Sequence, residues 1–94
     1  MDASEALAWG LIDEVVRPEA LRQRVQAYAE DLASKPAAAL AAIRRTVTLG
    51  GGMTFEDGMA LEMETATALA DTDDFAEGVS AFLNKRPPRW DCGA

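Results

Sequence analysis

Histidine is absent from this 94-residue chain, and cysteine occurs once, as Cys92. A single cysteine cannot form an internal disulfide, and a chain without histidine cannot supply a Cys/His nucleophile pair or a typical zinc site. We therefore expect no metal site and no catalytic thiol. Cys92 is interpreted as an inert thiol near the end of the chain, because nothing beside it would activate it.

Long apolar runs and basic residues are also scarce. No stretch approaches the roughly 20 apolar residues that cross a bilayer, and the opening MDASEALAWG lacks the basic start and apolar run of a signal peptide. The chain has nine basic and sixteen acidic residues, which gives a net charge of −7. Such a surface disfavours the phosphate backbone of nucleic acids. We expect a soluble cytoplasmic protein with neither nucleic acid nor a membrane as a partner.

Aromatic residues make up only 6% of the chain, although 49% of it is hydrophobic and much of that is alanine. Alanine favours helices but buries little apolar area per side chain. A chain of this size forms one domain at most and buries a modest fraction of its surface. The composition therefore predicts a helical protein that needs close helix packing, or a neighbouring molecule, to gain much from burial.

Helix and strand signals follow one another along the chain. Asp2 and Glu5 have the spacing of a capping box, and Gly10 is placed to end a short leading helix. LIDEVV at 11–16 predicts a short strand. A strand needs a partner, and no second strand is evident, so either this assignment is wrong or the partner lies outside the chain.

Four longer helices are predicted after that segment. Their boundaries are set by Pro18 and SKP (34–36), by Pro36 and GGG (50–52), by a Thr54 cap and DTDD (71–74), and by DTDD and Pro87. The predicted fold is mainly α: a short leading helix and one short strand, followed by four helices, in a single helical segment over residues 1–94.

Apolar residues recur at helical spacing in these segments and are expected to be packed. They include the stripe Leu40, Ile43 and Val47, the methionines Met53, Met59 and Met63, and the group Phe75, Val79, Phe82 and Leu83.

Two possible sites are set aside on their spacing. The triple glycine lacks the ending of a phosphate-binding loop and follows a helix. Glu62 and Glu64, two residues apart, do not face each other on a helix and cannot form a catalytic pair.

The closing segment AFLNKRPPRW (81–90) concentrates positive charge at the end of an acidic chain. Phe82 and Lys85 are three residues apart, which predicts that they lie on the same side of the last helix. A ring beside an ammonium group could hold a base and a phosphate together. The alternative, favoured by composition, is that Phe82 is a core residue and Lys85 only complements the helix dipole.

Three segments taken in order, ASEALAWGLIDEVV (3–16), LASKP (32–36) and TDDFAEGVSAFLNKR (72–86), resemble the C-terminal third of the enoyl-CoA hydratase/isomerase, or crotonase, family. The resemblance covers essentially the whole chain. It implies the helical region that mediates trimers, or dimers of trimers, with an N-terminal domain of β-β-α turns lying upstream in relatives. It would also explain the strand at 11–16, which would dock on that domain.

The resemblance further implies acyl-CoA substrates, with coenzyme A as part of the substrate and no separate cofactor. The catalytic glutamates and oxyanion hole of relatives lie upstream, and no residue here matches them. No catalytic residue is therefore assigned, and the chain alone is not expected to catalyse. The aromatic and lysine of the last helix contact the CoA nucleotide in several relatives, often across a subunit boundary. These positions correspond to Phe82 and Lys85, with Arg86 as a weaker addition.

Two hypotheses follow. In the first, the chain is the oligomerising and CoA-site-covering region of an enoyl-CoA hydratase/isomerase-like protein. In the second, it is a self-standing acidic helical interaction module without CoA binding.

Overall fold

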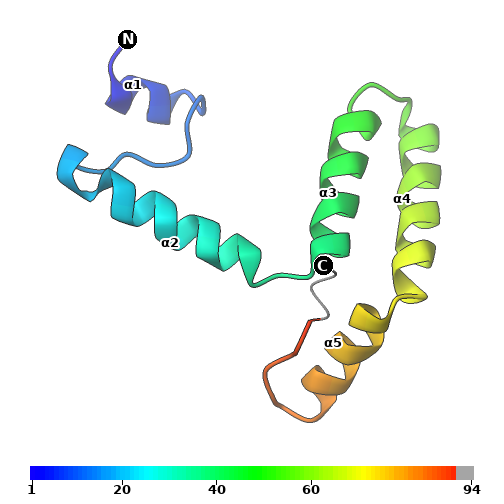
Figure 1. The fold of residues 1–94 in the computed structure, drawn as a ribbon. Coiled ribbons are helices and arrows are strands. Elements are labelled where there is room, and N and C mark those ends of the chain that lie inside the picture. Colours follow the sequence, from blue (N-terminus) through cyan, green and yellow to red (C-terminus); the bar gives the residue numbers. More distant parts are fainter. Residues whose placement is uncertain (91–94) are drawn as a thin grey trace. The chain divides into compact units, whose positions relative to one another are not determined.

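The computed structural model describes residues 1–90, so Cys92 lies outside the described part of the chain. Helices account for most of it (Figure 1). In chain order they are α1 (Ala3–Ala8), the 3-10 helix η1 (Pro18–Ala20), α2 (Leu21–Ala33), α3 (Ala37–Gly50), α4 (Phe55–Ala70) and α5 (Asp73–Leu83). The prediction of a mainly helical fold is confirmed. The chain divides into two compact units, Met1–Leu32 and Ala33 onward.

The first unit begins as its sequence predicts. The Asp2 carboxylate accepts a hydrogen bond from the Glu5 backbone N–H at 2.8 Å, and Glu5 accepts one from the Asp2 N–H at 3.2 Å. Gly10 takes a positive φ of 78°, and the N–H of Leu11 bonds the carbonyl of Ala6 at 2.9 Å. This is the glycine-terminated helix end that relieves unsatisfied carbonyls in the last turn.

The strand expected at 11–16 is not formed. Residues 11–17 are irregular, and no strand occurs within residues 1–90. Apolar and β-branched residues alone do not make a strand, because the backbone N–H and C=O groups need a second strand to bond. The prediction is wrong for the chain as it stands.

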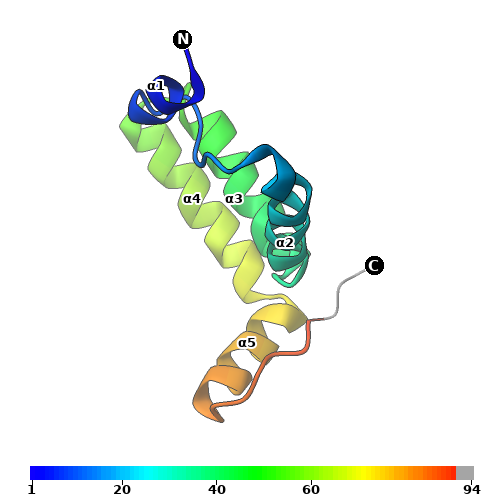
Figure 2. The same cartoon turned by 90° about the vertical axis from the view of Figure 1, so that its left-hand side faces the viewer.

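The second unit is built on a hairpin of helices. In Figures 1 and 2, α3 and α4 run antiparallel side by side, and α5 packs at the far end of α4. The Thr54 hydroxyl accepts a hydrogen bond from the Asp57 N–H at 3.2 Å and thereby caps α4, as predicted. The turn between α3 and α4 begins directly after Gly50.

Very little of this structure is buried. Among the described residues only Leu61 (8% exposed) and Ala81 (2%) are buried. The predicted stripe of α3 is largely uncovered, with Ile43 59% and Val47 70% exposed. The methionines at 53, 59 and 63 are exposed as well, so the expectation that they fill a core is wrong. A two-helix hairpin has only one inner face, so the remaining apolar faces find no cover within the described residues of this unit.

Among the helices formed by residues 1–90, none combines the length and apolarity that crossing a membrane requires.

Candidate functional site

The closing segment is positioned by the two ends of α5. At its start, the Thr72 hydroxyl accepts a hydrogen bond from the Phe75 N–H at 3.2 Å, while Asp73 and Asp74 lie in the first turn. At its end, the helix stops at Leu83, four residues before the proline that was expected to end it. The predicted boundary at Pro87 is therefore too late, because the chain turns before the proline is reached.

Lys85 makes that turn. It is the one non-glycine residue with positive φ in the described chain, at 51°. The N–H of Arg86 bonds the Ala81 carbonyl at 3.0 Å, and that of Lys85 bonds the Phe82 carbonyl at 3.3 Å. These two bonds define the helix end in which glycine usually takes the left-handed position. Lys85 thus lies two residues beyond the end of α5, and the prediction that it lies on the last helix with Phe82 is wrong in that respect.

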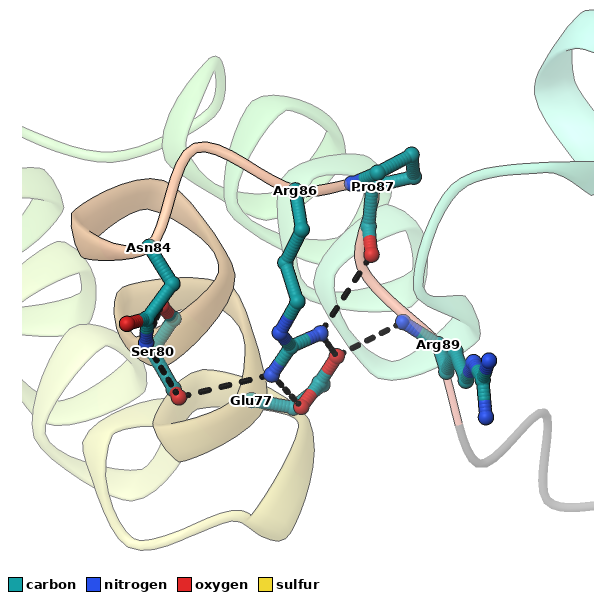
Figure 3. A network of polar contacts seen from close by, with 6 residues as sticks. All are labelled: Glu77, Ser80, Asn84, Arg86, Pro87 and Arg89. Carbon is teal, nitrogen blue, oxygen red and sulfur yellow. Dashed lines mark hydrogen bonds and ion pairs between the residues drawn. The ribbon is translucent and has the colours of Figure 1, made fainter.

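The Glu77 side chain binds the segment that follows the turn (Figure 3). Its two carboxylate oxygens accept hydrogen bonds from the Arg86 guanidinium, at 2.7 Å from Nη1 and 2.9 Å from Nη2. The same carboxylate accepts the backbone N–H of Arg89 at 2.7 Å. Such a two-pronged arginine–carboxylate pair is both strong and geometrically defined. We call Glu77, Arg86 and Arg89 the Glu77 clamp.

The clamp determines the ionisation of its carboxyl group. The hydrogen bonds from Arg86, reinforced by the Arg89 N–H, lower the pKa of Glu77 from 4.5 to about 2. The same hydrogen bonds raise the pKa of Arg86, because the Glu77 carboxylate stabilises the charged guanidinium. Near neutral pH Glu77 therefore holds no proton, and it is unsuited to general acid–base catalysis, which needs a pKa near the working pH.

An apolar cavity of about 380 Å³ lies where the start of α3, the end of α4 and one face of α5 meet. The predicted apolar group of the last helix forms one wall of it, namely Phe75, Val79, Phe82 and Leu83. All four side chains are exposed, so the expectation that they are packed is wrong. Trp90 forms another part, and its ring lies against Gly78, where a Cβ would come within 3.2 Å of the indole. Gly78 therefore provides the space in which the indole rests.

The three predicted CoA-binding residues differ in their exposure and in their polar partners. Phe82 lies on the last turn of α5 and is 83% exposed, which contradicts its reading as a core residue. Lys85 is exposed, and no hydrogen bond or ion pair of its ammonium occurs within residues 1–90. Arg86 is bound to Glu77 through both terminal nitrogens of its guanidinium, and its side chain is 40% exposed.

Sequence reasoning did not assign roles to Glu77 and Trp90. Glu77 lies nine positions before Arg86, and helical spacing predicts contacts only three or four positions apart. The pairing of Glu77 with Arg86 depends on the chain reversal at Lys85, which the local sequence pattern does not predict. A usable signal was Gly78 in the middle of a helix, since a glycine there often marks the close approach of another group.

Residues 1–90 contain no group of three or more histidine, cysteine, aspartate or glutamate side chains that could hold a metal ion. The arrangement offers an exposed ring, an exposed ammonium and an apolar cavity. Its chemistry is that of binding a ligand or a neighbouring surface.

Comparison with known proteins agrees with these features. Residues 1–92 match the family model described as enoyl-CoA hydratase/isomerase. An (E)-benzylidenesuccinyl-CoA hydratase from Thauera aromatica is 36% identical over 90 residues, which cover 96% of this chain and 35% of that protein. A 1,2-epoxyphenylacetyl-CoA isomerase from Escherichia coli (strain K12) is 33% identical over 90 residues, covering 96% and 34%.

A solved structure shows the same correspondence. The crystal structure of an enoyl-CoA hydratase/isomerase from Mycobacterium paratuberculosis superposes with a TM-score of 0.93 at 30% identity, over 98% of this chain and 36% of that one. The chain spans about a third of the length of the curated relatives that it matches. With the ordered motifs, the family match and the superposition in agreement, this chain belongs to the enoyl-CoA hydratase/isomerase family.

Proposed function

We propose that this chain forms the oligomerisation and CoA-site-covering region of an enoyl-CoA hydratase/isomerase-like protein that acts on acyl-CoA thioesters. The observation that carries the proposal is the near absence of a core. Twenty-one large apolar side chains are exposed in the described chain, against two buried residues. Exposed apolar faces of this extent are typical of surfaces that other protein covers.

The proposed partners are further copies of the protein, arranged as a trimer or a dimer of trimers, together with the upstream domain of the family. The resemblance of residues 3–16 and 72–86 to the crotonase C-terminal region supports this assignment.

Phe82 and Lys85 are the proposed CoA contacts. The exposed ring can stack on a base, and the ammonium, which has no described partner, can meet a phosphate. Arg86 remains the weaker proposed contact, because both of its terminal nitrogens are already bonded to Glu77. Its bonds to Glu77 also hold the backbone that directly follows Lys85.

The reaction is proposed by analogy as hydration of a 2-enoyl-CoA thioester. The relatives are named for a hydratase and an isomerase, which supports CoA-thioester chemistry in general. The 94 residues alone are not expected to carry it out, because the resemblance places the catalytic glutamates and the oxyanion hole of relatives upstream of the region that this chain matches.

The test begins with sedimentation velocity and continues with a calorimetric titration of CoA into the assembled species. We expect association beyond the 10.0-kDa monomer and CoA binding that the double variant Phe82→Ala, Lys85→Ala abolishes. The matched control is Phe55→Ala with Lys35→Ala, the same two residue types outside the closing segment; it should bind as the unmodified chain does.

Contrary outcomes are equally specific. A monomer that does not bind CoA would favour the acidic helical interaction module instead. Hydration of crotonyl-CoA at an enzyme-like rate by the 94 residues would contradict the proposal that the chain is inactive alone.

A further inference from the structure

Lys85 occupies a backbone conformation that its residue type adopts rarely. Its φ of 51° lies in the left-handed region, and the helix-end hydrogen bonds of Lys85 and Arg86 require it there. Glycine fills this position in most proteins because it has no Cβ. Residues held in rarely adopted conformations cluster at functional sites, so Lys85, with its ammonium exposed, is a candidate for a role of the side chain.

The Glu77 clamp holds the chain on the far side of this turn. Arg86 follows Lys85 directly, and its guanidinium is bound to both oxygens of Glu77. The Arg89 N–H bonds the same carboxylate, so the segment is tied down again after Pro87 and Pro88, whose φ angles are fixed by their rings. The backbone on both sides of Lys85 is thereby anchored to α5.

The clamp also separates the charges. Arg86 is neutralised by Glu77, and the guanidinium of Arg89 points away from the carboxylate (Figure 3). Lys85 remains as an exposed cation, three positions after Phe82 in the sequence. The Glu77 side chain is 23% exposed.

We infer that Glu77 is a positioning residue, which, through Arg86 and the Arg89 backbone, fixes the turn that presents the Lys85 ammonium to the nucleotide phosphates of CoA. The inference rests on the proposed function and adds to it a residue that does not touch the ligand. It predicts that the carboxylate acts on CoA affinity through Lys85 and by no separate route.

The experiment is a double-mutant cycle on the assembled chain, with CoA as the probe and affinities measured by NMR titration near neutral pH. Glu77→Gln removes the carboxylate charge and should weaken CoA binding roughly tenfold, the size of coupling common between residues of one network. Lys85→Gly keeps the left-handed turn but removes the ammonium. In the Lys85→Gly background, Glu77→Gln should have no further effect on the affinity.

Two more variants separate positioning from general damage. Glu64→Gln removes one exposed carboxylate from α4, outside the clamp, and should leave the affinity unchanged. Arg86→Gln breaks the clamp from its other side while leaving Glu77 in place, and should reproduce the loss seen with Glu77→Gln. Sedimentation velocity and circular dichroism accompany each titration, and the clamp variants should assemble like the unmodified chain.

The outcomes distinguish the two proposals. Unchanged affinity in Glu77→Gln, or an equal loss with and without Lys85, overturns the positioning role and leaves the proposed CoA contact standing. Loss of assembly in both Glu77→Gln and Arg86→Gln assigns the clamp a purely structural role and also overturns the inference. If the unmodified assembly does not bind CoA, the proposed contact fails first, and the inference fails with it.

Discussion

At the scale of single residues, the closing segment is governed by a conflict at Lys85. The left-handed conformation costs an L-residue about 1–2 kcal/mol, yet the reversal after α5 requires it. The hydrogen bonds of Arg86 to Ala81 and to Glu77 lie immediately beyond the turn and offset this cost. Local preference is thus overridden by bonds to residues one and two helical turns away.

The Glu77 clamp should respond to acid. Because the folded-state pKa of Glu77 is lowered from 4.5 to about 2, its contribution to stability is present above pH 4.5 and is lost as the pH falls toward 2. Trp90 rests against Gly78 directly after the clamp, so its fluorescence reports the event. We expect a change in Trp90 emission between pH 4.5 and 2, measured in a Trp9→Phe background that leaves one tryptophan.

Glu77→Gln provides the control, since an amide does not titrate. In that variant the transition between pH 4.5 and 2 should disappear, and the emission near neutral pH should already resemble the acid form. An identical acid transition with and without the carboxyl group would show that another group is responsible.

At the scale of elements, the helix starts were the most predictable features. The Asp2–Glu5 capping box and the Thr54 cap form as predicted, and Thr72, within the predicted boundary DTDD, caps α5. Each depends on a side chain that bonds the backbone within three residues. The end of α5 was not predictable to the same degree. Pro87 gave a later limit, whereas the observed end at Leu83 depends on bonds that reach back along α5.

Two helical glycines allow a matched test of packing. A Cβ on Gly58 of α4 would make an ordinary contact, at 3.9 Å from the Gly50 carbonyl, whereas one on Gly78 of α5 would lie 3.2 Å from the Trp90 ring. Replacing glycine by alanine inside a helix stabilises it by about 1 kcal/mol. Gly58→Ala should therefore show this gain in urea denaturation followed by circular dichroism.

Gly78→Ala should gain less, because the indole must move by a few tenths of an ångström to make room. Its Trp90 emission should shift, again in the Trp9→Phe background, while Gly58→Ala leaves that emission unchanged. Equal gains in stability with unchanged emission in both variants would contradict the packing of Trp90 on Gly78.

At the scale of the whole molecule, the dominant feature is apolar surface without a cover. Burying one Val or Ile side chain contributes about 1.5–3 kcal/mol, and α3 leaves Ile43 and Val47 largely exposed. Covering this apolar surface with other protein would therefore stabilise the fold.

Polar substitutions on that stripe should separate association from folding. Ile43→Gln with Val47→Gln is expected to reduce self-association in sedimentation velocity by exposing less apolar surface. The helix content should hold, because surface substitutions usually change stability by less than about 0.5 kcal/mol. Arg44→Gln, between the two positions, serves as the control and should associate like the unmodified chain. A loss of helix content in the double variant would show that these side chains already pack within the unit.

The sequence by itself determined the helical class, the caps, the apolar stripe of α5 and the family. These features depend on local spacing or on ordered motifs, which need no knowledge of distant contacts. It also indicated Phe82, Lys85 and Arg86 as candidate CoA contacts, but it did not show which of them are bound to other residues of the chain. Only the tertiary structure decided that Arg86 is bound to Glu77, that Lys85 lies beyond the helix and that 11–16 forms no strand. The Arg86–Glu77 pair and a strand at 11–16 depend on hydrogen-bond partners outside the local pattern, and the helix end at Lys85 depends on a left-handed conformation that its residue type does not indicate.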